Sequence, residues 1–240
     1  MPLPKISTPT YELELPSTGK KIKYRPFLVR EEKILIMALE SENIKDISSA
    51  IVQILNDCIL TKGINVSDLS TFDIEYLFLN VRAKSVGETI EVNVTCPDDG
   101  ETTTKVEINI DDIKVQKSSE HKNIIKLDDN LSMKLKYPSL NEFVENNFEV
   151  NEDGNDVNKS LSMITSCIDT IYDQEESWSA SDCTKKELDE FIDQLNTKQF
   201  KEIESFFTTM PKLSHNIKVT NPKTKVESEV VLEGLASFFS

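Results

Sequence analysis

The chain has 240 residues, and 38% of them are apolar, which is enough to form a hydrophobic core. Its 42 acidic and 27 basic residues give a net charge of −15. Because this charge repels phosphate backbones and anionic lipid headgroups, we expect no nucleic-acid partner and no membrane partner. The longest apolar run, Ile34 to Leu39, is much shorter than the roughly 20 residues of a membrane span.

The N-terminal stretch lacks the charged start and apolar core of a secretory signal, so we expect a soluble chain that stays in the compartment of its synthesis. The four cysteines are scattered along the sequence, which favours free thiols over a disulfide framework. They are Cys58, Cys96, Cys167 and Cys183.

The first third of the chain is predicted to form a hairpin and three helices. Two alternating stretches around a Pro-Ser-Thr-Gly turn predict the hairpin over residues 11–27. Apolar residues at helical spacing then predict a helix over 29–39 and a second helix that starts at Asp46 or Ser48 and ends at Gly63. A third helix, capped by Ser70 or Thr71, is apolar nearly all round. We expect this third helix to be central and buried.

Two further hairpins are predicted after Gly87, where the apolar period changes to two. The first spans the alternating stretches 90–94 and 106–110, and the second turns at residues 128–130. The remainder is predicted to be mainly helical, over 140–148, 157–172, a segment opened by a capping box at Thr184 and Glu187, and 197–210. A strand, turn and strand close the chain over 215–239.

Two helix–hairpin segments resemble each other. Residues 74–78 (IEYLF) have a counterpart in 203–207 (IESFF), and 92–97 (VNVTCP) match 217–222 (IKVTNP). Either the chain contains a duplication, or any two helix–hairpin units look alike at this length. A duplication would give two related arms that pair through their central helices.

The turn CPDDG begins like one arm of a zinc knuckle, which needs a second cysteine close after Cys96. Asp98 and Asp99 occupy those places, and Asn221 occupies the position that corresponds to Cys96 in the second arm. The sequence also lacks a glycine-rich phosphate loop, a nucleophile elbow and an H-E-x-x-H motif. We therefore expect no metal, no cofactor, no catalytic residues and no enzymatic activity.

The acidic segment 169–182 is one candidate binding region, expected to be a loop. It contains Glu175, Glu176 and the single tryptophan, Trp178. A lone tryptophan in a polar loop either covers the neighbouring core or forms a contact point, and an acidic segment either steers a basic partner or is simply solvated.

The paired aromatic residues Phe238 and Phe239 form the second candidate. They either fold back onto the core or anchor the chain in a pocket of a neighbouring subunit, because aromatic anchors dominate many interfaces.

The sequence resembles the baseplate hub subunits and hub assembly proteins of T-even-type contractile-tailed phages. The runs that carry the resemblance are 70–100, with its D-x-x-Y-L-F helix, 108–115, 124–139 and 215–239. The family pattern includes a Cys-Pro-x-Cys knuckle in some members, from which this chain departs at Asp99. The resemblance implies a non-catalytic protein that binds other hub or tail proteins, in the host cytoplasm during assembly or in the tail baseplate of the virion. The alternative is a soluble adaptor or chaperone-like module outside any virion.

The predicted fold class is α+β, with several antiparallel hairpins and two related helix–hairpin units that contain a degenerate zinc-knuckle-like turn. We expect three parts: an N-terminal hairpin over 1–28, a first helix and hairpin unit over 29–138, and a second helical unit with a C-terminal hairpin over 139–240.

Overall fold

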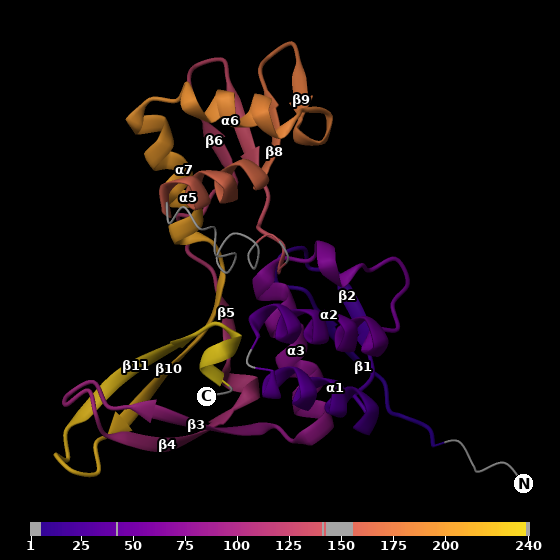
Figure 1. Ribbon diagram of the computed structural model, residues 1–240, viewed down its shortest axis with the longest axis vertical. Coiled ribbons are helices and arrows are strands. Elements are labelled where there is room, and N and C mark those ends of the chain that lie inside the picture. Colours follow the sequence, from indigo (N-terminus) through magenta and orange to yellow (C-terminus); the bar gives the residue numbers. More distant parts are fainter. Residues whose placement is uncertain (1–5, 42, 141, 143–155, 239–240) are drawn as a thin grey trace, which may run out of the picture. The chain divides into compact units, whose positions relative to one another are not determined.

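The computed structural model describes residues 6–41, 43–140, 142 and 156–238, and it confirms the α+β class (Figure 1). Helices and antiparallel sheets form two compact units. Unit 1 consists of residues 1–116 and 212–240, and unit 2 consists of residues 117–211.

Unit 1 begins with the predicted hairpin and three helices. Their bounds are β1 Tyr11–Glu14, β2 Lys21–Tyr24, α1 Val29–Glu40, α2 Ile44–Cys58 and α3 Thr71–Val86. Helix α2 starts earlier than expected, because the side chain of Asn43, and not that of Asp46 or Ser48, accepts the N–H of Lys45 at the helix start. It also ends at Cys58, and Gly63 lies in the turn beyond it.

Helix α3 is the buried helix that the sequence predicts. It starts after Ser70 and ends at Val86, just before Gly87. Its buried apolar side chains occur all around the helix and are Phe72, Ile74, Leu77, Phe78, Leu79, Val81 and Ala83. At its N-terminus the buried carboxylate of Asp73 accepts the backbone N–H of Ser17 at 3.0 Å, which attaches the β1–β2 turn to the helix.

Two long hairpins complete unit 1. Their strands are β3 Thr89–Thr95 with β4 Thr103–Asn109, and β10 Lys212–Thr220 with β11 Glu227–Glu233. Strand β10 also pairs with β5 (Lys114–Gln116), which gives a three-stranded sheet in the order β11-β10-β5. One hydrophobic core joins α3 to both hairpins and includes Leu79, Val92, Ile108, Val219 and Leu232.

The pairing of β5 with β10 explains why these units differ from the three parts expected from the sequence. It returns the C-terminal hairpin to the unit that contains the N-terminus, so unit 2 is inserted between β5 and β10. The expectation that the two related arms pair through their central helices stays a prediction, because the two helices belong to different units. Helix α3 belongs to unit 1 and α7 (Thr197–Thr209) to unit 2, whereas the two hairpins share one core.

An ion pair is buried where β2 meets α1 and α2. The Arg25 guanidinium lies 2.9 Å from the Glu31 carboxylate and donates to the Asp57 carbonyl. Glu31 is fully buried and also accepts the Leu28 N–H at 2.7 Å. Burial by itself would raise the pKa of Glu31, but hydrogen bonds from Arg25, the Leu28 N–H and Arg30 outweigh burial and lower the pKa from 4.5 to about 2.

This shift predicts an acid dependence of stability. Because the folded-state pKa of Glu31 is depressed, its stabilisation is fully present above about pH 4.5 and is lost as the pH falls towards 2. The shift corresponds to about 3 kcal/mol. Denaturant unfolding of Glu31→Gln and of the wild-type chain should therefore give stabilities that differ at pH 7 and converge near pH 2. A difference that stays constant over this range would contradict the assignment.

Unit 2 is a four-stranded antiparallel sheet in the order β6-β7-β8-β9, packed with helices. Its elements are β6 Ile124–Lys126, β7 Ser132–Leu135, α5 Asp156–Ser166, β8 Ile168–Tyr172, β9 Ser177–Ser179, α6 Lys185–Asp193 and α7. The core combines Ile125, Met133 and Ile171 of the sheet with Leu188 of α6 and Phe206 of α7. The capping box of Thr184 and Glu187 and the helix 197–209 are confirmed.

The helix predicted over 157–172 is wrong in its second part. Helix α5 ends at Ser166, and Ile168–Tyr172 form strand β8, which pairs with β7 and β9. β-Branched residues at 168, 170 and 171 favour the strand once a partner strand is available. The predicted helix 140–148 and the polar segment 151–155 lie mostly outside the described residues.

Candidate interaction surfaces

The segment expected to be an acidic loop is a β-hairpin. Strands β8 and β9 pair antiparallel, and the Asp173 carboxylate accepts the N–H groups of Glu175 and Glu176 in the turn, at 2.8 and 2.7 Å. These two hydrogen bonds lower the pKa of Asp173, and the bond from Glu176 has the larger effect. Glu175 and Glu176 are exposed at the hairpin end.

Trp178 lies on the hairpin, directly opposite the buried Ile171. Residues directly opposite each other in an antiparallel pair share one face of the sheet, so the indole stands beside the core. It remains 41% exposed because β9 is the last strand of the sheet. Trp178 thus partly covers the core and still presents apolar surface.

The structure describes one of the two C-terminal aromatic residues, Phe238. Phe238 is only 1% exposed and belongs to the core of unit 1, so it folds back and does not present an anchor. Phe239 lies outside the described residues.

The negative charge is concentrated in unit 2. The segment 117–211 contains 20 acidic and 10 basic residues, a net charge of −10, whereas the rest of the chain contains 22 acidic and 17 basic residues. A basic partner is therefore attracted more strongly to unit 2 than to unit 1.

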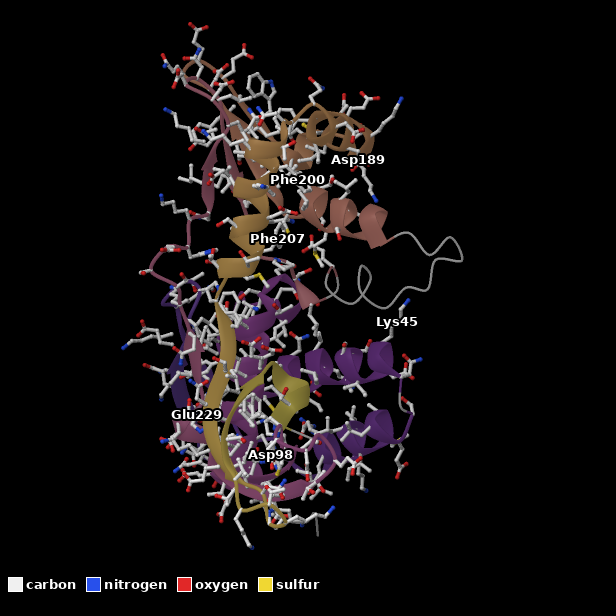
Figure 2. All side chains as sticks on the ribbon, turned by 90° about the vertical axis from the view of Figure 1, so that its left-hand side faces the viewer. Lys45, Asp98, Asp189, Phe200, Phe207 and Glu229 are labelled. Atoms are coloured by element: carbon white, nitrogen blue, oxygen red, sulfur yellow. The ribbon has the colours of Figure 1, made fainter. Side chains whose placement is uncertain are left out.

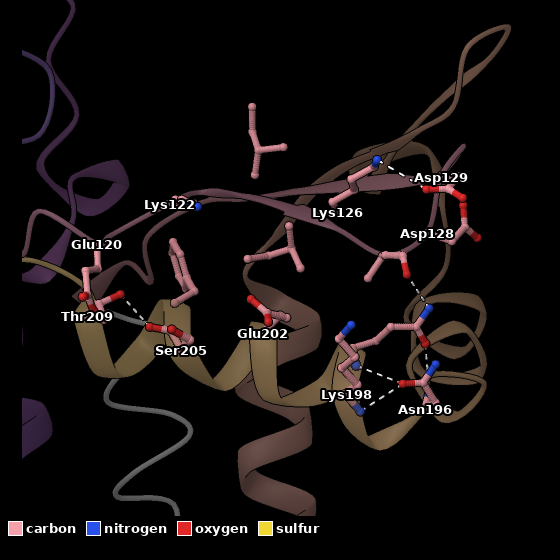
Figure 3. Close-up of a pocket in the computed structure, with 15 residues that line it drawn as sticks. Glu120, Lys122, Lys126, Asp128, Asp129, Asn196, Lys198, Glu202, Ser205 and Thr209 are labelled. Atoms are coloured by element: carbon pink, nitrogen blue, oxygen red, sulfur yellow. Dashed lines mark hydrogen bonds and ion pairs between the residues drawn. The ribbon is translucent and has the colours of Figure 1, made fainter.

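A groove of about 610 Å³ runs between β6 and α7 within unit 2 (Figure 3). Lys122 and Lys126 lie on the strand side, while Glu202 and Ser205 come from α7. Three lysines and four acidic residues line the groove, and Lys126 is paired with Asp129 at 3.6 Å. The groove is thus mainly polar and charged, with a slight excess of carboxylates.

Strand β6 forms one edge of the sheet, and only every second residue along it is hydrogen-bonded to β7. The Leu127 N–H donates to the Leu131 carbonyl at 2.9 Å. The Leu135 N–H donates to the Asn123 carbonyl at 2.8 Å. In an antiparallel ladder the backbone of every second residue is hydrogen-bonded to the partner strand. The backbone N–H and carbonyl groups of residues 123, 125 and 127 therefore point towards β7.

The backbone groups of the intervening residues, Ile124 and Lys126, consequently point away from β7, at the open edge. Within the described part of the chain no strand pairs with this edge. Ile124 is also 49% exposed. The edge therefore offers two N–H groups, two carbonyl groups and an apolar side chain to an extended segment.

An aromatic cluster lies at the end of the groove that Thr209 lines. The two ring nitrogens of His121 lie 3.0 Å from the hydroxyls of Thr209 and Tyr137. The imidazole stacks on Tyr137 and lies 5.1 Å from the ring of Phe206, centroid to centroid. Burial, with a smaller contribution from the charge of Lys117, lowers the pKa of His121, so the ring is neutral at pH 7.

Helix α1 exposes apolar side chains on its outer face. Only Glu31 and Ala38 are buried in this helix, whereas Val29, Ile36, Met37 and Leu39 are 45 to 70% exposed. Exposed apolar side chains grouped on one helix are typical of protein–protein contact surfaces. This α1 face lies in unit 1 and is a second candidate surface.

Among the described residues, no three His, Cys, Asp or Glu side chains are grouped closely enough to hold a metal ion. No described helix is long and apolar enough to cross a membrane. The expectation that the chain lacks enzymatic activity stays a prediction.

The comparison with protein families decides the identity. The family model described as T4 bacteriophage base plate protein matches residues 8–240. The chain belongs to this family. No curated protein and no solved structure matches it. The role of this base plate protein therefore lies in the structure or the assembly of a phage base plate, and its partners are phage tail proteins. The resemblance seen in the sequence is confirmed at this level, while the assignment to the hub stays a prediction.

Sequence reasoning did not find the groove of the base plate protein. The sequence predicts a short strand before the turn at 128–130, but the order of strands in a sheet depends on pairing between distant segments. The only local signal is the isoleucine at 124, which in a three-residue strand does not reveal that it stands at an open edge.

Proposed function

We propose that this base plate protein is a non-catalytic hub subunit or hub assembly factor that works by binding other tail proteins. The observation that carries the proposal is the open edge of β6 beside the groove, in a chain of the base plate family. The occupant we propose is an extended segment of another tail protein, which pairs with β6 as a fifth strand. Family membership disfavours the alternative, an adaptor or chaperone-like module outside a virion.

Strand addition suits this edge for chemical reasons. The backbone groups of Ile124 and Lys126 supply hydrogen bonds that do not depend on the partner's sequence, and the side chains along the groove supply specificity. Glu202 and Asp128 favour basic side chains in the incoming strand. The other edge of the sheet is β9, which contains Trp178 and follows the acidic turn, and it provides a control within the same unit.

A proline substitution tests the proposal. Lys126→Pro removes an outward N–H and leaves the bonds to β7 in place, because proline is tolerated on the open side of an edge strand. We expect the variant to fold normally, as judged by circular dichroism, and to be incorporated into base plates at least tenfold less than wild type, since about 1.4 kcal/mol of lost binding energy is a tenfold loss of affinity. Incorporation is measured as copies per purified base plate from a phage that carries the variant.

Ser179→Pro is the matched control. Ser179 lies on the other edge, its N–H points away from β8, and its φ of −73° already suits proline. It should leave incorporation unchanged. Equal incorporation of the Lys126→Pro and wild-type chains would contradict binding at β6. An equal loss of incorporation in both proline variants would indicate that the loss is not specific to the β6 edge.

The α1 face is a second contact surface, supported by its exposed apolar residues.

Copies of the chain in finished particles would indicate a hub subunit, while a chain found only in incomplete base plates would indicate an assembly factor.

A further inference from the structure

The turn between β3 and β4 has a defined geometry. This first turn comprises residues 96–100, Cys-Pro-Asp-Asp-Gly. The Cys96 N–H donates to the Thr102 carbonyl at 2.7 Å, and the Gly100 N–H donates back to the Cys96 carbonyl at 3.0 Å. Gly100, the fifth residue, has a φ of 68°, in the left-handed region.

The turn between β10 and β11 repeats this geometry. This second turn comprises residues 221–225, Asn-Pro-Lys-Thr-Lys. The Asn221 N–H donates to the Val226 carbonyl at 2.9 Å, and the Lys225 N–H donates back to the Asn221 carbonyl at 2.9 Å. The fifth residue again has a positive φ, 65°, although it is a lysine. The first five residues of the two turns are therefore equivalent, whereas the first turn has one more residue before its partner strand begins.

The two turns are joined to each other through Asp98. Figure 2 labels this residue on the hairpin of β3 and β4. The Asn221 side-chain amide donates to both Asp98 carboxylate oxygens, at 2.9 and 3.0 Å, and the Thr224 hydroxyl donates to the same carboxylate. Asn221 and Cys96 are both fully buried. The bonds from Thr224 and Asn221 lower the pKa of Asp98, so the carboxylate is ionised at neutral pH.

The side chains at the joined turns do not fit a zinc ion. In a pair of zinc knuckles the first and fourth residues of each turn supply thiolate or imidazole ligands. Here those residues are Cys96, Asp99, Asn221 and Thr224, which provide one thiol, one carboxylate, an amide and a hydroxyl. The Asp99 carboxylate is already occupied by the N–H and the hydroxyl of Thr102.

We propose that the two turns are a metal-free knuckle pair in which the carboxylate of Asp98 takes the place of a metal ion. The carboxylate belongs to the first turn and accepts hydrogen bonds from the second turn, so it holds the two turns together. A metal ion shared by two ligand-bearing turns holds them together in the same way. In both turns the fifth N–H donates to the first carbonyl and the fifth residue has a positive φ, although a set of four zinc ligands is absent. This inference concerns unit 1 and does not depend on the proposed binding function of unit 2.

Restoring the ligands tests the geometry. The variant Asp99→Cys/Asn221→Cys/Thr224→Cys, together with Cys96, should bind one zinc per chain and show the absorption of tetrahedral cobalt thiolate with Co²⁺. Adding Cys96→Ser to this variant should weaken zinc binding by at least tenfold, because it removes one of the four direct ligands and the loss of even an outer-shell partner costs about 10–100-fold. A folded triple variant that takes up no zinc, or a wild-type chain that purifies with one zinc per chain, would overturn the proposal.

A second measurement uses the chain with its natural turns, so the test does not depend on the folding of the triple variant. Asp98→Ala should speed amide hydrogen exchange at Asn221 and Lys225 about tenfold, the effect of losing roughly one hydrogen bond to a charged group. Glu101→Ala, an exposed carboxylate beside the same turn, is the control and should leave exchange unchanged. Unchanged exchange in Asp98→Ala would show that the carboxylate does not hold the turns together.

Discussion

Replacing Leu77 by alanine is expected to destabilise unit 1 by about 2–5 kcal/mol, the range for a fully buried leucine. Leu77 is 0% exposed and lies in α3, the helix that packs against the other elements of unit 1. Truncation removes apolar contacts and leaves a cavity that the surrounding helices and hairpins fill only in part. The measurement is denaturant unfolding followed by the circular dichroism of the whole chain.

Val86→Ala is the matched control on the same helix. Val86 is the last residue of α3 and is 60% exposed, so its truncation should change the stability by less than about 0.5 kcal/mol. Similar small changes for both variants would mean that α3 faces solvent and that the core of unit 1 is wrongly described. Because the chain has two compact units, the circular dichroism of the whole chain is supplemented by a probe in each unit.

Replacing Arg25 by methionine is expected to cost about 3–5 kcal/mol, the usual result of removing one partner of a buried ion pair. Methionine keeps much of the apolar stem but leaves the buried Glu31 carboxylate without its buried cation. Arg30 still contacts Glu31, but the Arg30 side chain is 67% exposed and its charge is largely solvated.

Two further variants test this explanation. Lys218→Met breaks an exposed pair with Glu229, whose charged atoms lie 3.9 Å apart, and should cost between 0 and about 1 kcal/mol. Arg25→Met combined with Glu31→Gln removes both charges and should be more stable than Arg25→Met alone. If the double variant is no more stable than Arg25→Met, the cost lies in lost packing and not in the unpaired carboxylate.

The local elements of the fold could be predicted from the sequence because their signals are local. Alternation in β3 and β4, the apolar residues of α3 and the capping box at Thr184 each reflect neighbours within a few residues. The strand Ile168–Tyr172 was assigned to a helix because a short apolar segment satisfies both periods, and only its pairing with β7 decides between them.

The long-range features could not be predicted for the same reason. The pairing of β5 with β10 decides the division into units, and the carboxylate of Asp98 meets Asn221 only because two hairpins 123 residues apart share a core. The candidate surfaces likewise include some that the sequence indicated and some that it could not indicate. The sequence indicated Trp178, Glu175 and Glu176, which are exposed in part or in full, but it could not distinguish a buried Phe238 from an anchor or find the edge of β6.

The most direct test of the central claim is the yield of complete base plates from a phage in which the coding sequence of this chain is deleted. Base plates are separated by sedimentation and counted by electron microscopy, and the intact chain supplied from a plasmid serves as the control. We expect complete base plates to be absent without the chain, incomplete ones to accumulate, and the plasmid to restore assembly. Complete base plates at the normal yield in the deletion strain would contradict a role of this protein in base plate structure or assembly.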